Sequence, residues 1–223
     1  MKLIIGNKNY SSWSLRPWFF LKQSQVPFIE HQIPLDLSNP YTHDDLKRYF
    51  SDYKVPLLVA ESASDNNSPA FQVWDSLAIM EYVADKIPEI AAWPENIEAR
   101  AVARSVSAEM HSSFQALRNA LPMNCRKDFP NYPISPLVQK DVARIQAVWA
   151  YCRQYAVPGQ WLFGEFSIAD AMYAPIVLRF KGYDVKLSED ARNYCNFVLS
   201  NKHIQSWIEA AKLEKEIIPE DEV

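Results

Sequence analysis

The sequence has little cysteine, no long apolar run and no excess of basic residues. Its three cysteines, Cys125, Cys152 and Cys195, lie far apart, and no C-x-x-C pair occurs. This spacing argues against a disulfide scaffold and against a zinc site, since both need clustered cysteines, and it fits a reducing cytoplasm. We therefore predict a cytoplasmic protein that binds no metal.

Two kinds of partner are also excluded. No stretch approaches the ~18 consecutive apolar residues that a membrane-spanning helix needs, and the apolar start of the chain is too short for the core of a signal peptide. The 27 acidic residues outnumber the 23 Lys and Arg, so the formal net charge is −4, and no basic stripe stands out. We expect neither nucleic acid nor a membrane as a partner.

The first part of the chain, residues 1–86, predicts a small α/β unit. Apolar runs predict strands near residues 3–5, 28–35, 55–59 and 70–74, and helical spacing predicts helices near 14–25 and 76–86, with a short helical patch before residue 50. The first two strands can pair in parallel through a helical crossover, and the last two can form a hairpin whose polar tip is Glu61 to Pro69. Pro34, inside the second strand, confines that strand to a sheet edge.

The composition changes after residue 86. Two prolines bracket a segment without periodicity, 87–97, which we interpret as a linker between domains. Beyond it, residues 98–223 predict only helices. Apolar residues spaced by four and three predict one continuous helix from about Val102 to Leu117, and others follow near 138–152, after 167, at 188–201 and at 203–215. Ser167 and Asp170 have the spacing of a capping box.

A helix start near Tyr10 to Trp18 is the first candidate for chemistry. Ser14 is a plausible N-cap, because Pro17 would then lie in the first turn, where its missing N–H costs nothing. Ser11 and Ser12 would lie just ahead of the helix, near its positive end, which suits a phosphate, a carboxylate or a thiolate. Plain capping is the alternative explanation of these serines.

Four local motifs, in order along the chain, resemble the cytosolic glutathione S-transferase family. They are Ser11–Arg16 (S-S-W-S-L-R), similar to the serine-type and especially the zeta-class members; Val55-Pro56, at the place of a valine and cis-proline; Asp75–Ile79, for an E-S-x-A-I turn; and Ser167–Asp170, preceded by Phe163-Gly164. The resemblance spans Met1 to about Lys215. It implies a thioredoxin-like N-terminal domain (1–86), a linker (87–97) and an all-helical domain (98–223).

The resemblance also implies an activity, the attack of glutathione on small electrophiles as its thiolate. The serine-type motif assigns the hydrogen bond to the sulfur to Ser11, with Ser12 as the second choice. Tyr10 could donate instead, as a tyrosine does in other classes of the family. Either serine would act at a helix N-terminus, which favours a thiolate. Glutathione is then a co-substrate, and no metal is implied.

The remaining motifs imply where glutathione would bind. Val55 and Pro56 would meet its cysteinyl part through their backbone, Lys54 could reach its glycyl carboxylate, and Asp75 and Ser76 would hold its γ-glutamyl end. An ordinary exposed lysine and an ordinary helix cap are the plainer interpretations of Lys54 and of the Asp75-Ser76 pair. Arg16 could contact a carboxylate or simply support its helix.

In the helical domain, His111, Phe114 and Gln115 could line the pocket of the second substrate, although a lone histidine on a helix is more often a solvated or satisfied residue. The family also implies a homodimer. Trp13 stands where zeta enzymes have a cysteine, which weakens the case for one alternative, a maleylacetoacetate isomerase. A non-catalytic ligand-binding protein of the same fold is the other alternative, and the electrophile is not given by the sequence.

Overall fold

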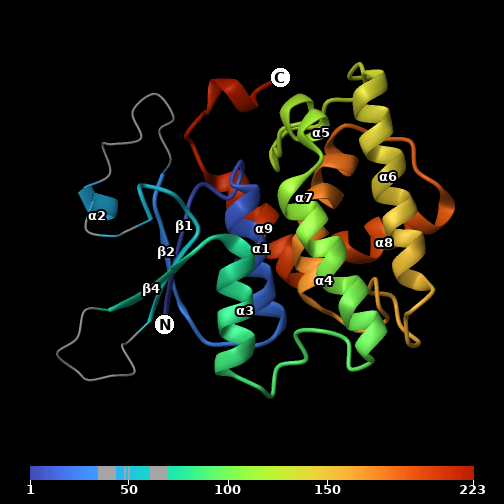
Figure 1. Cartoon of the computed structure of the whole chain (residues 1–223). Coiled ribbons are helices and arrows are strands. Elements are labelled where there is room, and N and C mark those ends of the chain that lie inside the picture. Colours follow the sequence, from blue (N-terminus) through green and yellow to red (C-terminus); the bar gives the residue numbers. More distant parts are fainter. Residues whose placement is uncertain (35–43, 48, 50, 61–69) are drawn as a thin grey trace.

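A computed structural model gives the fold, and it describes residues 1–34, 44–47, 49, 51–60 and 70–223. The expected hairpin tip, Glu61 to Pro69, lies outside the described residues. Four short strands form one sheet in the order β2-β1-β3-β4 (Figure 1). They are β1 (Lys2–Ile5), β2 (Ile29–Gln32), β3 (Leu57–Ala60) and β4 (Phe71–Trp74).

The strand pairing agrees with the sequence prediction. β1 pairs with β2 in parallel, and β3 pairs with β4 in antiparallel register, while β1 and β3 are antiparallel neighbours at the centre. β2 lies at an edge, as predicted. The reason given for this prediction is wrong, because β2 ends at Gln32 and Pro34 follows the strand instead of lying inside it. Because proline has no N–H to donate, the strand stops before reaching it.

Helices α1 (Ser12–Gln23) and α3 (Ser76–Lys86) lie between the sheet and the helical domain, whereas the short α2 (Asp44–Lys47) lies on the other side of the sheet (Figure 1). The helical domain contains α4 (Ile97–Ser112), α5 (Gln115–Ala120), α6 (Pro136–Arg153), α7 (Ile168–Gly182), α8 (Glu189–Leu199) and α9 (Lys202–Leu213). All of α7 except Lys181 is buried, so α7 forms the centre of this domain. None of the helices among the described residues is long and apolar enough to cross a membrane.

The predicted start of the first helix is wrong. The helix begins at Ser12 with Ser11 as its N-cap, and Pro17 therefore lies in its interior. The hydroxyl of Ser11 accepts a hydrogen bond from the N–H of Ser14 (3.3 Å), and the hydroxyl of Ser14 accepts one from the N–H of Gly6 (3.1 Å). These contacts place the N-cap at Ser11, three residues before Ser14, the N-cap that the position of Pro17 had suggested.

The predicted continuous helix from Val102 to Leu117 is also wrong. α4 ends at Ser112, and Phe114 takes a left-handed backbone conformation (φ 66°) before α5 begins. The carboxylate of Asp141 accepts from the N–H of Leu117 (3.0 Å), which satisfies a donor at the new helix start. Phe114 and Leu117 are both buried. The helical spacing of apolar residues therefore continues across the break, and this spacing alone could not predict that the helix ends there.

The capping box at the start of α7 is confirmed. The carboxylate of Asp170 accepts from the N–H of Ser167 (3.0 Å), and it also accepts from the N–H of Leu162 (2.9 Å) and the hydroxyl of Tyr194 (3.0 Å). Complete burial nevertheless raises the pKa of Asp170 to about 6.

One hydrophobic core joins the sheet to the helical domain. It includes Leu3 of β1 and Leu15 of α1 together with Met110 of α4, Tyr173 of α7 and Trp207 of α9. A smaller cluster, on Ile4, Ile33, Leu46 and Leu57, lies on the face of the sheet that α2 covers. Cys152 is part of the large core, as expected, and burial raises the pKa of its thiol to about 12.

Candidate active site

A cavity of about 520 Å³ lies beside the N-terminus of α1. Its walls come from the loop before α1, from the segment before β3, from the helical domain and from the C-terminal segment. The lining residues are Tyr10, Ser11, Ser12, Trp13, Asp52, Tyr53, Lys54, Val55, Arg118, Pro122, Met123, Arg179, Ile218 and Asp221. Four of the residues that the sequence proposed, Ser11, Ser12, Lys54 and Val55, therefore meet at one place.

The two serines differ in what their hydroxyls contact. The Ser11 hydroxyl donates to the hydroxyl of Ser14 (2.7 Å) and accepts from the N–H of Ser14, and Ser11 is buried. The half-buried Ser12 hydroxyl accepts from Nη2 of Arg179 (3.4 Å), and it donates its proton to no residue that the structure describes. Ser12 is thus the serine whose proton remains available to a ligand.

Two arginines give this cavity a positive wall. Arg179, from α7, is held by the carbonyl of Leu121 (2.8 Å to Nε), and its pKa is lowered to about 10 by burial and by the charge of Arg118. Burial also lowers the pKa of Arg118. Cations beside Ser12 favour an anion at that place.

Trp13 is packed against two arginines and a histidine. The guanidinium carbons of Arg16 and Arg118 lie 4.3 and 4.6 Å from the centroid of its ring, and the ring of His111 meets it edge-on at 5.3 Å. Arg16 is buried, and burial together with the two neighbouring arginines holds its pKa well below the ordinary value. Its Nε and Nη1 have no hydrogen-bond partner in the described part of the chain. Arg16 therefore supports this wall from behind Trp13.

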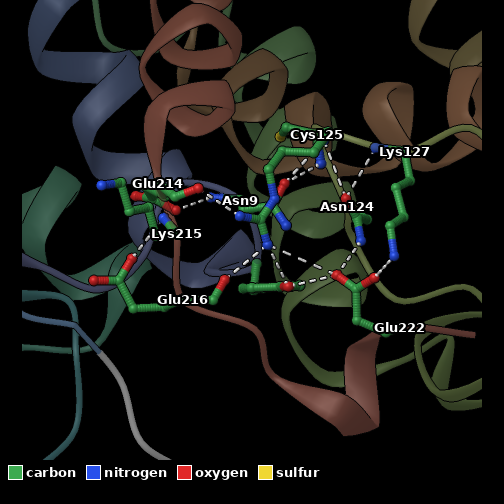
Figure 2. Close-up of polar contacts among 10 residues, drawn as sticks. Asn9, Asn124, Cys125, Lys127, Glu214, Lys215, Glu216 and Glu222 are labelled. Atoms are coloured by element: carbon green, nitrogen blue, oxygen red, sulfur yellow. Dashed lines mark hydrogen bonds and ion pairs between the residues drawn. The ribbon is translucent and has the colours of Figure 1, made fainter.

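The C-terminal segment, residues 214–223, forms the remaining wall, which the sequence did not predict. It contributes the buried Ile218 and also Asp221 to the cavity. At its far end, the carboxylate of Glu222 meets the side chains of Asn124 (3.0 Å to Nδ2) and Lys127 (Figure 2). These two residues belong to the loop between α5 and α6.

Arg126 and Tyr10 attach the same segment to the rest of the protein. Arg126 donates to the carbonyls of Glu214 (2.6 Å) and Glu216 (2.7 Å) and to the hydroxyl of Tyr10 (2.6 Å). The Tyr10 hydroxyl in turn donates to Glu222 (2.5 Å), and burial and that carboxylate raise its pKa. The Glu214 carboxylate accepts from the backbone of Lys8 and Asn9. The hydroxyl of Tyr10 is therefore occupied by the C-terminal segment.

Comparison with known proteins identifies the architecture. Residues 10–86 match the family described as glutathione S-transferase, N-terminal domain. A glutathione transferase homolog from Burkholderia, solved with bound glutathione, is 19% identical with a TM-score of 0.64, and the match covers 95% of this chain and 97% of that one. A sphingomonad glutathione S-transferase complexed with glutathione is 20% identical with a TM-score of 0.65, covering 96% and 100%. Glutathione transferase F2 from Populus trichocarpa is 21% identical with a TM-score of 0.63, covering 95% and 98%. A search of curated proteins found no match.

The chain has the glutathione S-transferase fold. The expected thioredoxin-like sheet followed by a helical domain is therefore confirmed. The Val55–Pro56 peptide bond is cis, as the family resemblance implied, with Val55 at the cavity and Pro56 buried.

Asp75 and Ser76 lie outside the cavity of this glutathione S-transferase fold. One carboxylate oxygen of Asp75 caps α3 by accepting from the N–H groups of Leu77 (2.9 Å) and Ala78 (3.1 Å). The other lies 2.9 Å from Nε2 of His111, which comes from α4 in the helical domain. Ser76 is buried, and its hydroxyl has no hydrogen-bond partner among the described residues.

The three residues proposed for the second substrate do not line the cavity. His111 is directed to Asp75 and Trp13, Phe114 is buried in the core, and Gln115 is exposed at the start of α5. The helical domain instead presents Arg118, Pro122, Met123 and Arg179. Phe114 and Gln115 lie at the break between α4 and α5, where the helical spacing that suggested their placement ends. Among the described residues, no cluster of three or more His, Cys, Asp and Glu side chains could hold a metal ion.

Proposed function

We propose that this protein is a glutathione transferase that ionises the thiol of glutathione at Ser12 and directs it to small electrophiles. The observation that carries the proposal is the Ser12 hydroxyl, which lies at the start of α1 inside the cavity, beside Arg179, and donates its proton to none of the described residues. The glutathione-bound structures of similar fold from Burkholderia and a sphingomonad support the choice of ligand.

The chemistry needs a thiolate near neutral pH, where a free thiol is mostly protonated. The Ser12 hydroxyl would donate one hydrogen bond to the charged sulfur, worth about 1.5–3 kcal/mol, or about one to two units of thiol pKa. The positive end of α1 and the Arg179 guanidinium favour the same charge. We assign this role to Ser12 and not to Ser11, because Ser11 already caps the helix and donates to Ser14.

Other residues would bind the rest of glutathione. We assign the cysteinyl part to the backbone of Val55 and Pro56, the glycyl carboxylate to the exposed Lys54, and the γ-glutamyl end to Asp75 and Ser76. The buried hydroxyl of Ser76, which has no hydrogen-bond partner in the described part of the chain, supports the last assignment, since a buried polar group without a partner is unfavourable. His111, through its contact with Asp75, would orient that carboxylate from the helical domain.

Equilibrium binding of glutathione, with the ultraviolet absorbance of the thiolate followed against pH, tests the proposal. We expect the wild type to bind glutathione and to form thiolate at a lower pH than free glutathione does. Binding without a shifted thiol would instead support a non-catalytic carrier. No binding would contradict the proposal and leave only the fold.

We also propose that the protein is a cytoplasmic homodimer. The edge strand β4 exposes Phe71 (46%) and Trp74 (45%), which are large apolar side chains suited to an interface. Light scattering measures the mass directly. Replacing Trp74 by Glu should yield monomers, and a wild type that is monomeric at micromolar concentration would contradict the proposal.

A further inference from the structure

Arg118 is a cation in the cavity, and some of its hydrogen-bond donors have no acceptor among the residues that the structure describes. Its side chain is held between the ring of Trp13 and the end of α4, where Nη2 donates to the carbonyl of Met110 (2.9 Å) and Nη1 to that of His111 (3.3 Å). A guanidinium has five N–H bonds. Three of them therefore have no partner among the described residues, although Arg118 lines the cavity.

The charges around the cavity do not neutralise Arg118. The other charged lining residues are Lys54, Arg179, Asp52 and Asp221. The charge of Asp221 raises the pKa of Arg179, although burial lowers it by more. Burial lowers the pKa of Arg118. No ion pair between described residues includes Arg118 or Arg179. A partly buried, unpaired cation is unfavourable, so a bound anion would stabilise it.

The remaining surface near Arg118 is apolar. Pro122 and Met123, from the segment after α5, and Ile218, from the C-terminal segment, line the same cavity and are all buried. A molecule that fits has an apolar body and one negatively charged group. In the proposed reaction Ser12 and Arg179 stabilise the thiolate of glutathione. Arg118 is then available to bind a second anion.

We propose that the second substrate is an electrophile that carries a carboxylate or a similar anionic group, and that Arg118 binds this group. The inference rests on the proposed function and adds the substrate class. A suitable probe is 4-chloro-3,5-dinitrobenzoate. The sulfur attacks the ring carbon that bears chlorine, a C–S bond forms, and the C–Cl bond breaks with release of chloride, so no oxidant or reductant is needed.

The experiment compares this acid with its neutral amide on the intact protein. Each kcat/KM is divided by the rate constant of the uncatalysed reaction with glutathione, which removes the difference in intrinsic reactivity. We expect the acid to be preferred at least about tenfold, the effect of one hydrogen bond to a charged group, and the preference to shrink as salt is added. Equal or better use of the amide would overturn the inference.

Variants identify the residue. Arg118→Met should abolish the preference for the acid, and Arg118→Lys should keep part of it. Arg144→Met is the matched control, because Arg144 forms an exposed ion pair with Glu109 (2.7 Å) away from the cavity. A preference that survives in a folded Arg118→Met protein would refute the assignment.

The thiolate signal, recorded without any electrophile, separates the two proposals. A shifted thiol with no preference for the acid contradicts only the role of Arg118. Absence of both a shifted thiol and turnover contradicts the proposed function, and the inference fails with it.

Discussion

Replacing Ser12 by Ala removes one hydroxyl from the cavity and leaves the helix cap in place. Ser11 still accepts from the N–H of Ser14, so α1 should keep its start. The only hydrogen bond of the Ser12 side chain in the described structure is the long one from Arg179 (3.4 Å), and Arg179 retains the carbonyl of Leu121. Little stability should therefore be lost.

The catalytic effect should be much larger. Loss of a hydrogen bond to a charged sulfur, about 1.5–3 kcal/mol, raises the pKa of bound glutathione by about one to two units and lowers kcat/KM about 10- to 100-fold near neutral pH. The assay is the pH titration of thiolate absorbance together with conjugation of the acid probe. Ser105→Ala, which changes an exposed hydroxyl on α4, is the control.

Ser11→Ala should have the opposite profile. It removes the N-cap and a partner of Ser14, at a cost of about 1 kcal/mol, which lowers Tm by about 2–4 °C for a chain of this size. Its thiolate titration should stay close to that of the wild type. If Ser11→Ala loses the thiolate and Ser12→Ala keeps it, the assignment is reversed, and if both variants keep it, neither serine activates the thiol.

Three further predictions concern the rest of the fold. Burial raises the pKa of Asp170 from 3.8 to about 6. The stability that protonated Asp170 contributes is therefore fully present below pH ~4 and is lost as pH rises through about 6, so the free energy of unfolding falls by about 3 kcal/mol in total. Denaturant unfolding should show this fall with pH in the wild type and not in Asp170→Asn. Arg126→Met should release the C-terminal segment, so amide hydrogen exchange there should become at least about tenfold faster while α7 stays protected; unchanged exchange would contradict the role given to Arg126. Gly164→Ala should destabilise the protein by about 2 kcal/mol or more, since φ is +92° and the added methyl overlaps the carbonyl of Val157. Gly182→Ala should be tolerated, because its added methyl would make only ordinary van der Waals contacts, 3.8 Å from the carbonyl oxygen of Lys127 and 3.9 Å from that of Asn124; equal melting temperatures for the two variants would refute this.

The sequence predicted the sheet and most helices because their signals are local. Apolar runs, helical spacing and Pro34 each act within a few residues of where they stand, and the pairing of β1 with β2 and of β3 with β4 followed from the connections. The antiparallel pairing of β1 with β3, which joins the two pairs into one sheet, did not follow from them. The errors came where side chains from elsewhere decide. The Asp141 side chain, on a different helix, accepts from the N–H of Leu117 at the start of α5, and the Ser14 side chain is held by the backbone N–H of Gly6 in the preceding loop.

The residues of the candidate site also fall into those that the sequence predicts and those that only the fold brings together. The serine pair, Lys54 and Val55 lie in motifs that can be recognised along the chain. Arg118, Arg179 and the C-terminal segment come from three distant stretches without a shared pattern, and only the fold brings them to one cavity. No spacing in the sequence marks Arg126, whose acceptors in the C-terminal segment lie about 90 residues further on.

The hydrophobic core that joins the sheet to the helical domain constrains how molecules reach the cavity. Separating the two halves about the connection between α3 and α4 would expose side chains such as Leu15, Tyr173 and Trp207 to water, at roughly 25 cal/mol for each Å² uncovered. Hinge opening is therefore a slow, costly route. The C-terminal segment is held mainly by polar contacts at its ends. We therefore expect ligands to enter and leave the cavity by movement of this segment. Their rates of release should respond to changes at Arg126 more than to changes in the connection between α3 and α4.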